Sequence, residues 1–283
     1  MQSQIIDGRK IKDDILAEVK EAVFSLPFSP VFCDILVGNN ISSVQYVKMK
    51  ARIAESVGIK FRTADFKESV TTEELIQEIE NLNNVPYMCG IIIQLPLPNH
   101  IDKKKVLDAI SPSLDVDCLG QINSENFYNN ENGISYPTAM ACMKILDSLK
   151  LDLKEKKIVM LGQGSLVGLP VTHLLRNRGY DVSTINSKTE NKEELIKNAD
   201  VVISAIGQGK FIKCEMVKKG VIIIDAGTSE DNGAVVGDVD LDSVSGVASF
   251  VSPTPGGVGP VTVAMLLLNV LSVARHKIKN ESK

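Results

Sequence analysis

Tryptophan is absent from the sequence, and aromatic residues make up only 5% of its 283 residues. An excess of positive charge is also absent, because 31 Lys and Arg residues are outnumbered by 35 Asp and Glu residues. A basic surface for nucleic acid or an anionic membrane is therefore not expected. With 44% hydrophobic and 23% charged residues, the composition is typical of a globular protein that binds small molecules.

Cysteine pairs with metal-binding spacing are missing as well. The cysteines are odd in number and form no Cys-x-x-Cys motif. They are Cys33, Cys89, Cys118, Cys142 and Cys214. This pattern argues against a disulfide framework and a structural zinc site, so we expect no metal and a reducing, cytoplasmic environment.

No apolar run reaches the length of a membrane helix. The most apolar stretch, residues 261–274, contains Asn269 and is shorter than the ~20 residues that a span needs. We expect a buried helix there. Residues 1–9 contain Asp7 and lack the apolar segment of a signal peptide, so we expect neither membrane attachment nor secretion.

Short apolar runs alternate with stretches that carry apolar residues at helical spacing. The runs expected to form strands are residues 31–37, 90–94, 157–161, 181–185, 201–206, 221–225 and 248–251. The stretches expected to form helices are residues 10–22, 42–57, 72–82, 137–149 and 166–176. Such alternation is typical of βαβ units, so we predict an α/β fold with parallel sheets.

The length indicates about two domains. The polar, turn-rich stretch 121–133 marks a boundary between them. We predict a first domain of residues 1–136, joined by the C-terminal helix of about residues 261–283, and a second domain of residues 137–260.

The second domain opens with a strand, a glycine-rich loop and a helix. Gly162, Gly164 and Gly168 form a G-x-G-x-x-x-G pattern, one residue longer than the common dinucleotide fingerprint. Glycines let a ligand approach the backbone, and free N–H groups at a helix start attract phosphate. The pattern favours a Rossmann-type nucleotide site, although a plain turn between strand and helix has the same glycines.

The next expected strand ends at Asn186, where folds that prefer NAD usually place an acidic residue. Ser187, Lys188 and Thr189 follow instead. These side chains can hold a 2′-phosphate, which favours NADP while leaving NAD possible. A solvated turn with a helix cap is the other interpretation.

In the first domain, Ser43, Tyr46 and Lys50 are spaced by three and four residues, so a helix places them on one face. They form either a site with a hydroxyl, an aromatic ring and an amine, or an ordinary exposed face. A Tyr-x-x-x-Lys pair also occurs in short-chain dehydrogenases, but there it follows the nucleotide loop. Here it precedes the loop by more than a hundred residues, which argues against that class.

Two further loops contain candidate binding residues. Gln94 ends a buried run and precedes Leu95-Pro96-Leu97-Pro98, at the strand end where ligands collect in parallel sheets. Asp115 and Asp117 follow in a loop, where a carboxylate can accept two hydrogen bonds from an amino-heterocycle or simply face solvent. The turn at residues 253–260, which is rich in proline and glycine, suits contact with a flat ligand, or simply ends a loop.

Taken in order, these motifs resemble the methylenetetrahydrofolate dehydrogenase/methenyltetrahydrofolate cyclohydrolase family from about Ile6 to Val273. The most specific motifs are Ser43-x-x-Tyr46-x-x-x-Lys50, Gln94-Leu95-Pro96-Leu97-Pro98, Asp115-Val116-Asp117 and Pro255-Gly256-Gly257-Val258-Gly259-Pro260-Val261-Thr262. The resemblance implies NADP-dependent oxidation of 5,10-methylenetetrahydrofolate and hydrolysis of the product to 10-formyltetrahydrofolate, a one-carbon donor for purine biosynthesis. It also implies a cytoplasmic homodimer, with a folate-binding catalytic first domain and a nucleotide-binding second domain.

The resemblance assigns a role to each candidate. It implies that Lys50 is the catalytic lysine, Tyr46 packs on the folate, Gln94 positions the lysine and Asp117 holds the pterin edge. The other substrate-binding candidates are Ser43, Pro255, Gly256 and Gly257. The cofactor-binding candidates are Gly162, Gln163, Gly164, Ser165, Ser187, Lys188 and Thr228.

Three positions depart from the family pattern. Gln163-Gly164 replaces a frequent Arg-Ser, residues 137–140 read Pro-Thr-Ala-Met instead of Pro-Cys-Thr-Pro, and Cys118 replaces glycine after Asp117. Three alternatives therefore stay open. They are a monofunctional NAD(P)-dependent dehydrogenase of the same family, a folate-binding protein without turnover, and a shikimate-type dehydrogenase.

Overall fold

The computed structural model describes residues 3–131, 133–231 and 233–281. The chain divides into two compact units. The six-stranded unit comprises Met1–Asp13 and Thr138–Thr262, and the three-stranded unit comprises Asp14–Pro137 and Val263–Lys283. The predicted domain ends at residues 1 and 283 lie outside the described residues.

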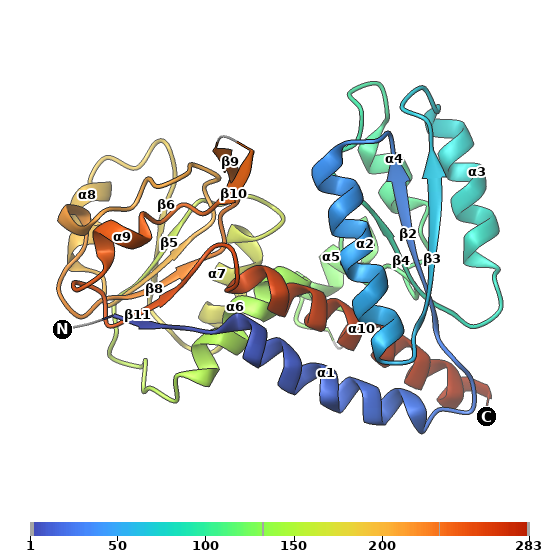
Figure 1. The fold of residues 1–283 in the computed structure, drawn as a ribbon, viewed down its shortest axis with the longest axis horizontal. Helices are drawn as coiled ribbons and strands as arrows, with labels where there is room; N and C mark the ends of the chain where they lie inside the picture. The colour runs from blue at the N-terminus through green and yellow to red at the C-terminus, as the bar shows by residue number, and fades with distance from the viewer. Residues whose placement is uncertain (1–2, 132, 232, 282–283) are drawn as a thin grey trace. The chain divides into compact units, whose positions relative to one another are not determined.

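The three-stranded unit contains a parallel sheet in the order β3-β2-β4 (Figure 1). Its strands are β2 (Val31–Val37), β3 (Lys60–Phe66) and β4 (Met88–Ile93). Its helices include α2 (Ile41–Ser56), α3 (Thr72–Asn83), α4 (Lys103–Asp108) and α5 (Gln121–Tyr128). Every residue of β4 is buried, as expected for a parallel strand covered on both faces.

The six-stranded unit contains a parallel sheet in the order β1-β11-β8-β7-β5-β6. Its strands are β1 (Gln4–Ile5), β5 (Ile158–Leu161), β6 (Val182–Ile185), β7 (Val201–Ser204), β8 (Ile222–Asp225) and β11 (Phe250–Ser252). The chain leaves β5 for β6 on one side and returns to β7 on the other. This reversal creates the crevice where Rossmann-type sheets bind ligands, which confirms the predicted α/β class.

Helices and a hairpin complete the six-stranded unit. The helices are α6 (Pro137–Ser148), α7 (Gly168–Asn177), α8 (Lys192–Asn198), η1 (Cys214–Met216) and α9 (Leu241–Val244). The hairpin pairs β9 (Ser229–Asp231) with β10 (Ala234–Val236). The predicted first domain includes residues 1–13, whereas the structure groups them with the six-stranded unit, because β1 extends that sheet beside β11.

Two helices, α1 (Gly8–Phe24) and α10 (Val258–Glu281), each contribute residues to both units. By length and composition, Val258–Asn280 is apolar enough to cross a membrane, but 61% of its most apolar window is buried inside the protein. Asn269 of α10 donates two 2.8 Å hydrogen bonds from Nδ2, to the backbone oxygens of Val116 and Ser135. These features are typical of a core helix, as the sequence analysis predicted for residues 261–274.

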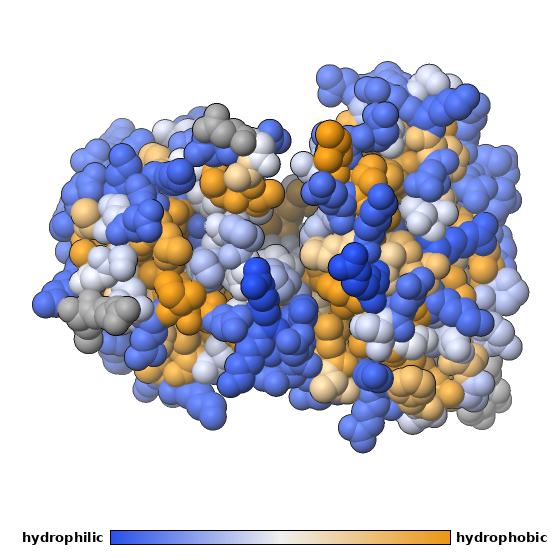
Figure 2. Space-filling model, viewed as in Figure 1, coloured by the Kyte–Doolittle hydropathy of each residue, from blue (hydrophilic) through white to orange (hydrophobic). Residues whose placement is uncertain are grey.

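The visible surface mixes hydrophilic and apolar side chains (Figure 2). Among the described residues, the most exposed large apolar side chains are Ile41 at 74% and Phe24 at 70%, and they belong to two different helices, α2 and α1. Isolated apolar residues of this kind are normal on a globular surface.

Candidate active site

Lys50 lies on the buried face of α2. Asn40 caps this helix by accepting a 3.0 Å hydrogen bond from the Ser43 N–H, and the helical spacing then places Ser43, Tyr46 and Lys50 on one side. Ser43 and Lys50 are buried and Tyr46 is half-buried. The alternative of an exposed helix face therefore does not describe these residues.

The Lys50 ammonium has three partners within the same unit. Its Nζ donates a 2.9 Å hydrogen bond to Gln94 Oε1 and lies 2.5 Å from Asp34 Oδ2. It also lies 4.9 Å from the centre of the Tyr46 ring, within cation–π range. Gln94 Nε2 donates a 2.7 Å hydrogen bond to the Leu95 carbonyl, which keeps the amide oxygen directed at the lysine.

Asp34 was not among the predicted site residues. It occupies the middle of β2, where its side chain is fully buried, and Lys50 is its one charged partner among the described residues. Burial raises the pKa of the Asp34 carboxyl, and the Lys50 ammonium opposes that shift. The signal available in the sequence was an acidic residue inside the apolar run Val31–Val37, which we interpreted as an ordinary strand.

The two predicted loop carboxylates have different surroundings. Asp115 is buried and accepts hydrogen bonds from the Leu119 and Gly120 N–H groups at 3.2 and 2.9 Å, so it holds the loop together. Asp117 is half-buried, and its carboxylate accepts no hydrogen bond from the described residues. Burial, reinforced by Asp115 and opposed by Lys50, raises the pKa of Asp117 to about 7.

Cys118 follows Asp117 at a position where the resembled family has glycine. Its backbone has a φ of 61°, in the left-handed region that glycine adopts without strain. Its buried thiol lies 3.4 and 3.5 Å from the carbonyls of Asn123 and Ile134, to which it donates. The loop thus keeps a glycine-like backbone, and the cysteine side chain is directed into the fold.

The glycine-rich loop connects β5 to α7 in the six-stranded unit. Gly162 has a φ of +85°, and a Cβ there would lie 2.5 Å from the Ala205 oxygen. A Cβ on Gly168 would lie 2.1 Å from the Gly162 oxygen, whereas Gly164 faces open space. The N–H groups of Gly164, Ser165 and Leu166 donate to no acceptor in the described parts of the chain. This geometry fits a phosphate group at the loop.

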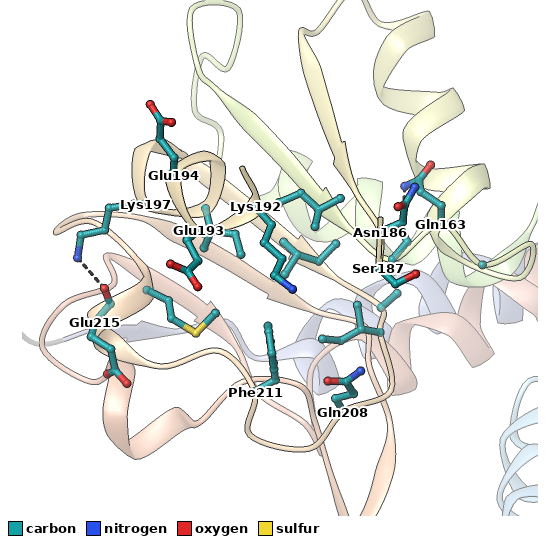
Figure 3. Close-up of a pocket in the computed structure, with 18 residues that line it drawn as sticks. Gln163, Asn186, Ser187, Lys192, Glu193, Glu194, Lys197, Gln208, Phe211 and Glu215 are labelled. Atoms are coloured by element: carbon teal, nitrogen blue, oxygen red, sulfur yellow. Dashed lines mark hydrogen bonds between the residues drawn. The ribbon is translucent and has the colours of Figure 1, made fainter. Parts of the chain in front are cut away.

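A pocket of about 1170 Å³ lies beyond the carboxyl ends of β5, β6 and β7 (Figure 3). Its apolar lining comes from residues that include Ile185, Ile206 and Phe211. Figure 3 shows Lys192 and Glu193 of α8 extending into this space, whereas Glu194 points away. The pocket therefore combines apolar lining residues with charged groups of both signs, Lys192 and Glu193 among them.

Only some predicted cofactor residues line the pocket. Gly162, Gln163, Gly164 and Ser187 do, whereas Ser165, Lys188 and Thr228 are exposed residues outside the lining. Lys192 and Glu193 are not among the predicted cofactor residues, because α8 is not among the predicted helices.

The Gln163 amide is directed away from the pocket. Its Nε2 donates to the Gly162 oxygen at 2.8 Å and to Thr172 Oγ1 at 3.1 Å. These bonds hold the side chain against α7, so the Gln163 amide nitrogen already donates within the protein.

The Pro255-Gly256-Gly257 turn belongs to the six-stranded unit. Gly256 has a φ of +106°, and a Cβ on Gly257 would lie 2.5 Å from the Pro253 oxygen. The start of α1 also packs closely on the turn, because a Cβ on Gly8 would lie 1.9 Å from the Gly257 oxygen. The three turn residues are thus in one unit, and the residues around Lys50 are in the other.

A Rossmann-type sheet with a glycine-rich loop and an open pocket defines a nucleotide-binding α/β protein, and its other unit contains a buried lysine with acidic and amide partners. Residues 6–117 match the model of the tetrahydrofolate dehydrogenase/cyclohydrolase catalytic domain. Residues 136–278 match the model of the NAD(P)-binding domain of the same family. The chain belongs to the tetrahydrofolate dehydrogenase/cyclohydrolase family.

Individual relatives agree with this assignment. The bifunctional protein FolD of Clostridium tetani is 39% identical over 95% of this chain and 98% of its own length. The crystal structure of FolD from Campylobacter jejuni is 37% identical, with a TM-score of 0.93 over 97% of this chain and 99% of its own. The Trypanosoma brucei FolD structure, complexed with NADP cofactor and inhibitor, is 34% identical, with a TM-score of 0.92 over 98% and 99% of the two chains. The predicted family resemblance is confirmed, and the shikimate-type alternative is not supported.

Proposed function

We propose that the protein oxidises 5,10-methylenetetrahydrofolate to 5,10-methenyltetrahydrofolate with NADP and hydrolyses the methenyl product to 10-formyltetrahydrofolate. The observation that carries this proposal is the buried Lys50 ammonium, held by Asp34 and Gln94 against the Tyr46 ring. Lys50 lies within the part of the chain that matches the catalytic domain of the tetrahydrofolate dehydrogenase/cyclohydrolase family, which supports a role for it in folate chemistry.

Folate binding is assigned to the three-stranded unit. The Tyr46 ring offers a flat apolar surface beside Lys50. The Asp117 carboxylate, which accepts no hydrogen bond from the described residues, can accept two from the pterin edge. Because Asp115 already stabilises the loop, Asp117 is available to the ligand. Ser43 lies on the same helix face and is a further proposed substrate contact. The Pro255-Gly256-Gly257 turn of the six-stranded unit stays a separate prediction of a substrate-binding segment.

The cofactor is assigned to the pocket of the six-stranded unit. The N–H groups of Gly164, Ser165 and Leu166 are proposed to bind its pyrophosphate, and Gly164 lets that group approach the backbone. Ser187 and Lys192 are the pocket groups suited to the 2′-phosphate. When bound there, NADP would supply the acceptor for the hydride that leaves the methylene carbon. The protein's task in this step is to bind and orient the two reactants.

The hydrolytic step adds water to the methenyl carbon, opens the ring at the bond to N5 and releases one proton. A side chain near that carbon must move the proton. Lys50 is the proposed group, because its amine is buried and Gln94 fixes its direction. Tyr46 and Gln94 are proposed to position the reacting groups.

Two alternatives of narrower scope follow from the departures in the sequence. A monofunctional dehydrogenase would produce the methenyl compound and stop, and a folate-binding protein would produce neither compound. The intact Lys50 network favours the bifunctional enzyme over both. We further propose that the protein is a cytoplasmic homodimer whose partners are tetrahydrofolate derivatives and that it binds neither nucleic acid nor membranes.

One assay tests the proposal. Purified protein is incubated with methylenetetrahydrofolate and either NADP or NAD, and the methenyl and formyl products are followed separately. Formation of both products with NADP is expected. A methenyl product that is hydrolysed no faster than in buffer would leave the monofunctional alternative, and the absence of both products would contradict the proposed enzyme.

A further inference from the structure

Asp34 is a buried charged group that takes no part in the proposed hydride and proton transfers. It lies in the central strand of its sheet, where Thr63 of β3 and Ile92 of β4 are its register partners. Its side chain has an exposed fraction of 0%, and Oδ1 has no hydrogen-bond partner among the described residues. A buried carboxylate at such a position is costly unless a cation compensates it.

The compensating cation is Lys50, whose side chain is only 3% exposed. Contact between the two charges occurs at 2.5 Å, between Nζ and Oδ2. Gln94 Oε1 provides the second oxygen around the same nitrogen, at 2.9 Å. An ammonium group has three N–H directions, so these two oxygens leave one direction for a ligand or water.

Other titratable groups also act on Asp34 and its neighbours. Asp65 of β3 adds negative charge near Asp34, and Asp117 lies within electrostatic range of both Asp34 and Lys50. Burial raises the pKa of the Tyr46 hydroxyl on α2, and the negative charges of Asp117 and Asp34 raise it further. Among these groups Asp34 is the one in ion-pair contact with the lysine, so it has the strongest influence on where the ammonium lies.

We propose that Asp34 is a positioning residue for the hydrolytic step: with Gln94 it fixes the Lys50 ammonium so that its remaining N–H group faces the folate site. This inference rests on the proposed function. It differs from a purely structural role, because Asp34 then affects turnover through the charge and direction of Lys50 in a protein that is correctly folded.

The test compares Asp34→Asn with Asp65→Asn. The first variant keeps the shape of the side chain and removes its charge beside Lys50, and the second makes the same change at an exposed residue of the neighbouring strand. For Asp34→Asn we expect the cyclohydrolase kcat to fall about tenfold or more, because a displaced Lys50 loses part of the ~10²–10⁴-fold that a positioned proton-transfer group contributes. The KM for the folate should change less than about twofold, because Tyr46 and Asp117 are intact.

The split between kcat and KM supplies a readout that a structural defect does not give, because a positioning group acts on turnover and leaves folate binding intact. Asp65→Asn should leave both constants close to wild type. A folded Asp34→Asn protein with wild-type kcat would overturn the proposal.

A second measurement keeps this test separate from the proposed function. In ¹⁵N-lysine spectra, an ammonium in a buried ion pair exchanges its protons slowly, and Lys50→Met identifies the Lys50 signal. Loss or displacement of that signal in Asp34→Asn supports the positioning role even in a protein without cyclohydrolase activity. An unchanged signal overturns the role, whatever the activity.

Asp34→Glu covers the case in which the asparagine variant does not fold. It keeps the negative charge but displaces it by one methylene group, so the Lys50 signal should persist at a shifted position. The cyclohydrolase kcat should fall while the folate KM changes less than twofold, as one misplaced group affects turnover more than binding. Wild-type kcat and signal position in Asp34→Glu would contradict the proposal.

Discussion

The Lys50 site and the nucleotide pocket differ in how their polar groups are satisfied. Around Lys50, the buried ammonium is paired with Asp34 and bonded to the Gln94 amide, whereas the Asp117 carboxylate accepts no hydrogen bond from the described residues. In the pocket, Ser187 is exposed and Lys192 extends into open space. Because the geometry of the Lys50 site is fixed, single substitutions there should have large effects on activity. In the nucleotide pocket binding is spread over many groups, so the effects of single substitutions should be small.

Substitution of the lysine should give the largest effect. Lys50→Met removes the amine that moves the proton, so cyclohydrolase activity should fall by about 10²–10⁴-fold. Cofactor binding should persist, because the glycine-rich loop belongs to the other unit. Stopped-flow decay of the methenyl absorbance measures the first effect, and cofactor fluorescence titration measures the second.

The matched control for this variant is Lys48→Met, which makes the same change at an exposed position of the same helix. It should retain activity close to wild type. If Lys50→Met hydrolysed the methenyl compound at the wild-type rate, Lys50 would not be the proton-transfer group, and the comparison between the two regions would lose its main support.

The next effect in size separates the two loop carboxylates. Asp117→Ala should weaken folate binding by about 1–3 kcal/mol, because pterin donors lose their acceptor in a partly buried site. Asp115→Ala should instead lower the free energy of unfolding, since the Leu119 and Gly120 N–H groups lose their acceptor. Isothermal titration and thermal unfolding of both variants distinguish the two roles. A folate Kd that moved less than threefold in Asp117→Ala would make Asp117 an ordinary loop residue.

A pH effect of about tenfold is expected at the same carboxylate. Because burial and Asp115 raise the pKa of Asp117 to about 7, the group is mostly ionised at pH 8 and mostly protonated at pH 6. Only the ionised form accepts two hydrogen bonds, so the folate Kd should rise about tenfold between pH 8 and pH 6. Asp117→Asn should remove this dependence. An equally steep dependence in that variant would assign it to another group.

The residues around Lys50 show what the sequence could and could not predict. Regular spacing predicted the shared helix face of Ser43, Tyr46 and Lys50, because helical geometry is local. The Asp34–Lys50 pair joins β2 to α2, and no local pattern reports which side chains meet across such a gap. Asp34 inside the apolar run Val31–Val37 was the available signal. Its role could be recognised only once Lys50 was known to lie beside it.

The elements predicted well were those with strong apolar patterns. Strand β2 has the bounds predicted for it, and α2 differs by one residue at each end. Strand β3 was missed, because Lys60, Arg62, Thr63 and Asp65 are exposed and interrupt the apolar pattern of this edge strand. Strand β1 has only two residues, and its pairing with β11 depends on contacts some 245 residues apart.

The smallest effect is expected in the cofactor pocket, where no single group dominates. Ser187→Ala combined with Lys188→Ala should lower kcat/KM for NADP a few-fold and scarcely change it for NAD, because only NADP has the 2′-phosphate.

Lys192 lines the pocket and Lys188 does not, so Lys192→Ala alone should lower kcat/KM for NADP more than Lys188→Ala alone. Glu193 sits beside Lys192 and would repel a phosphate, which keeps the preference for NADP modest. Glu193→Gln should therefore increase that preference. Steady-state kinetics with both cofactors decide the matter: a preference of the wild type for NAD, or equal losses for both cofactors in Lys192→Ala, would show that the phosphate binds elsewhere.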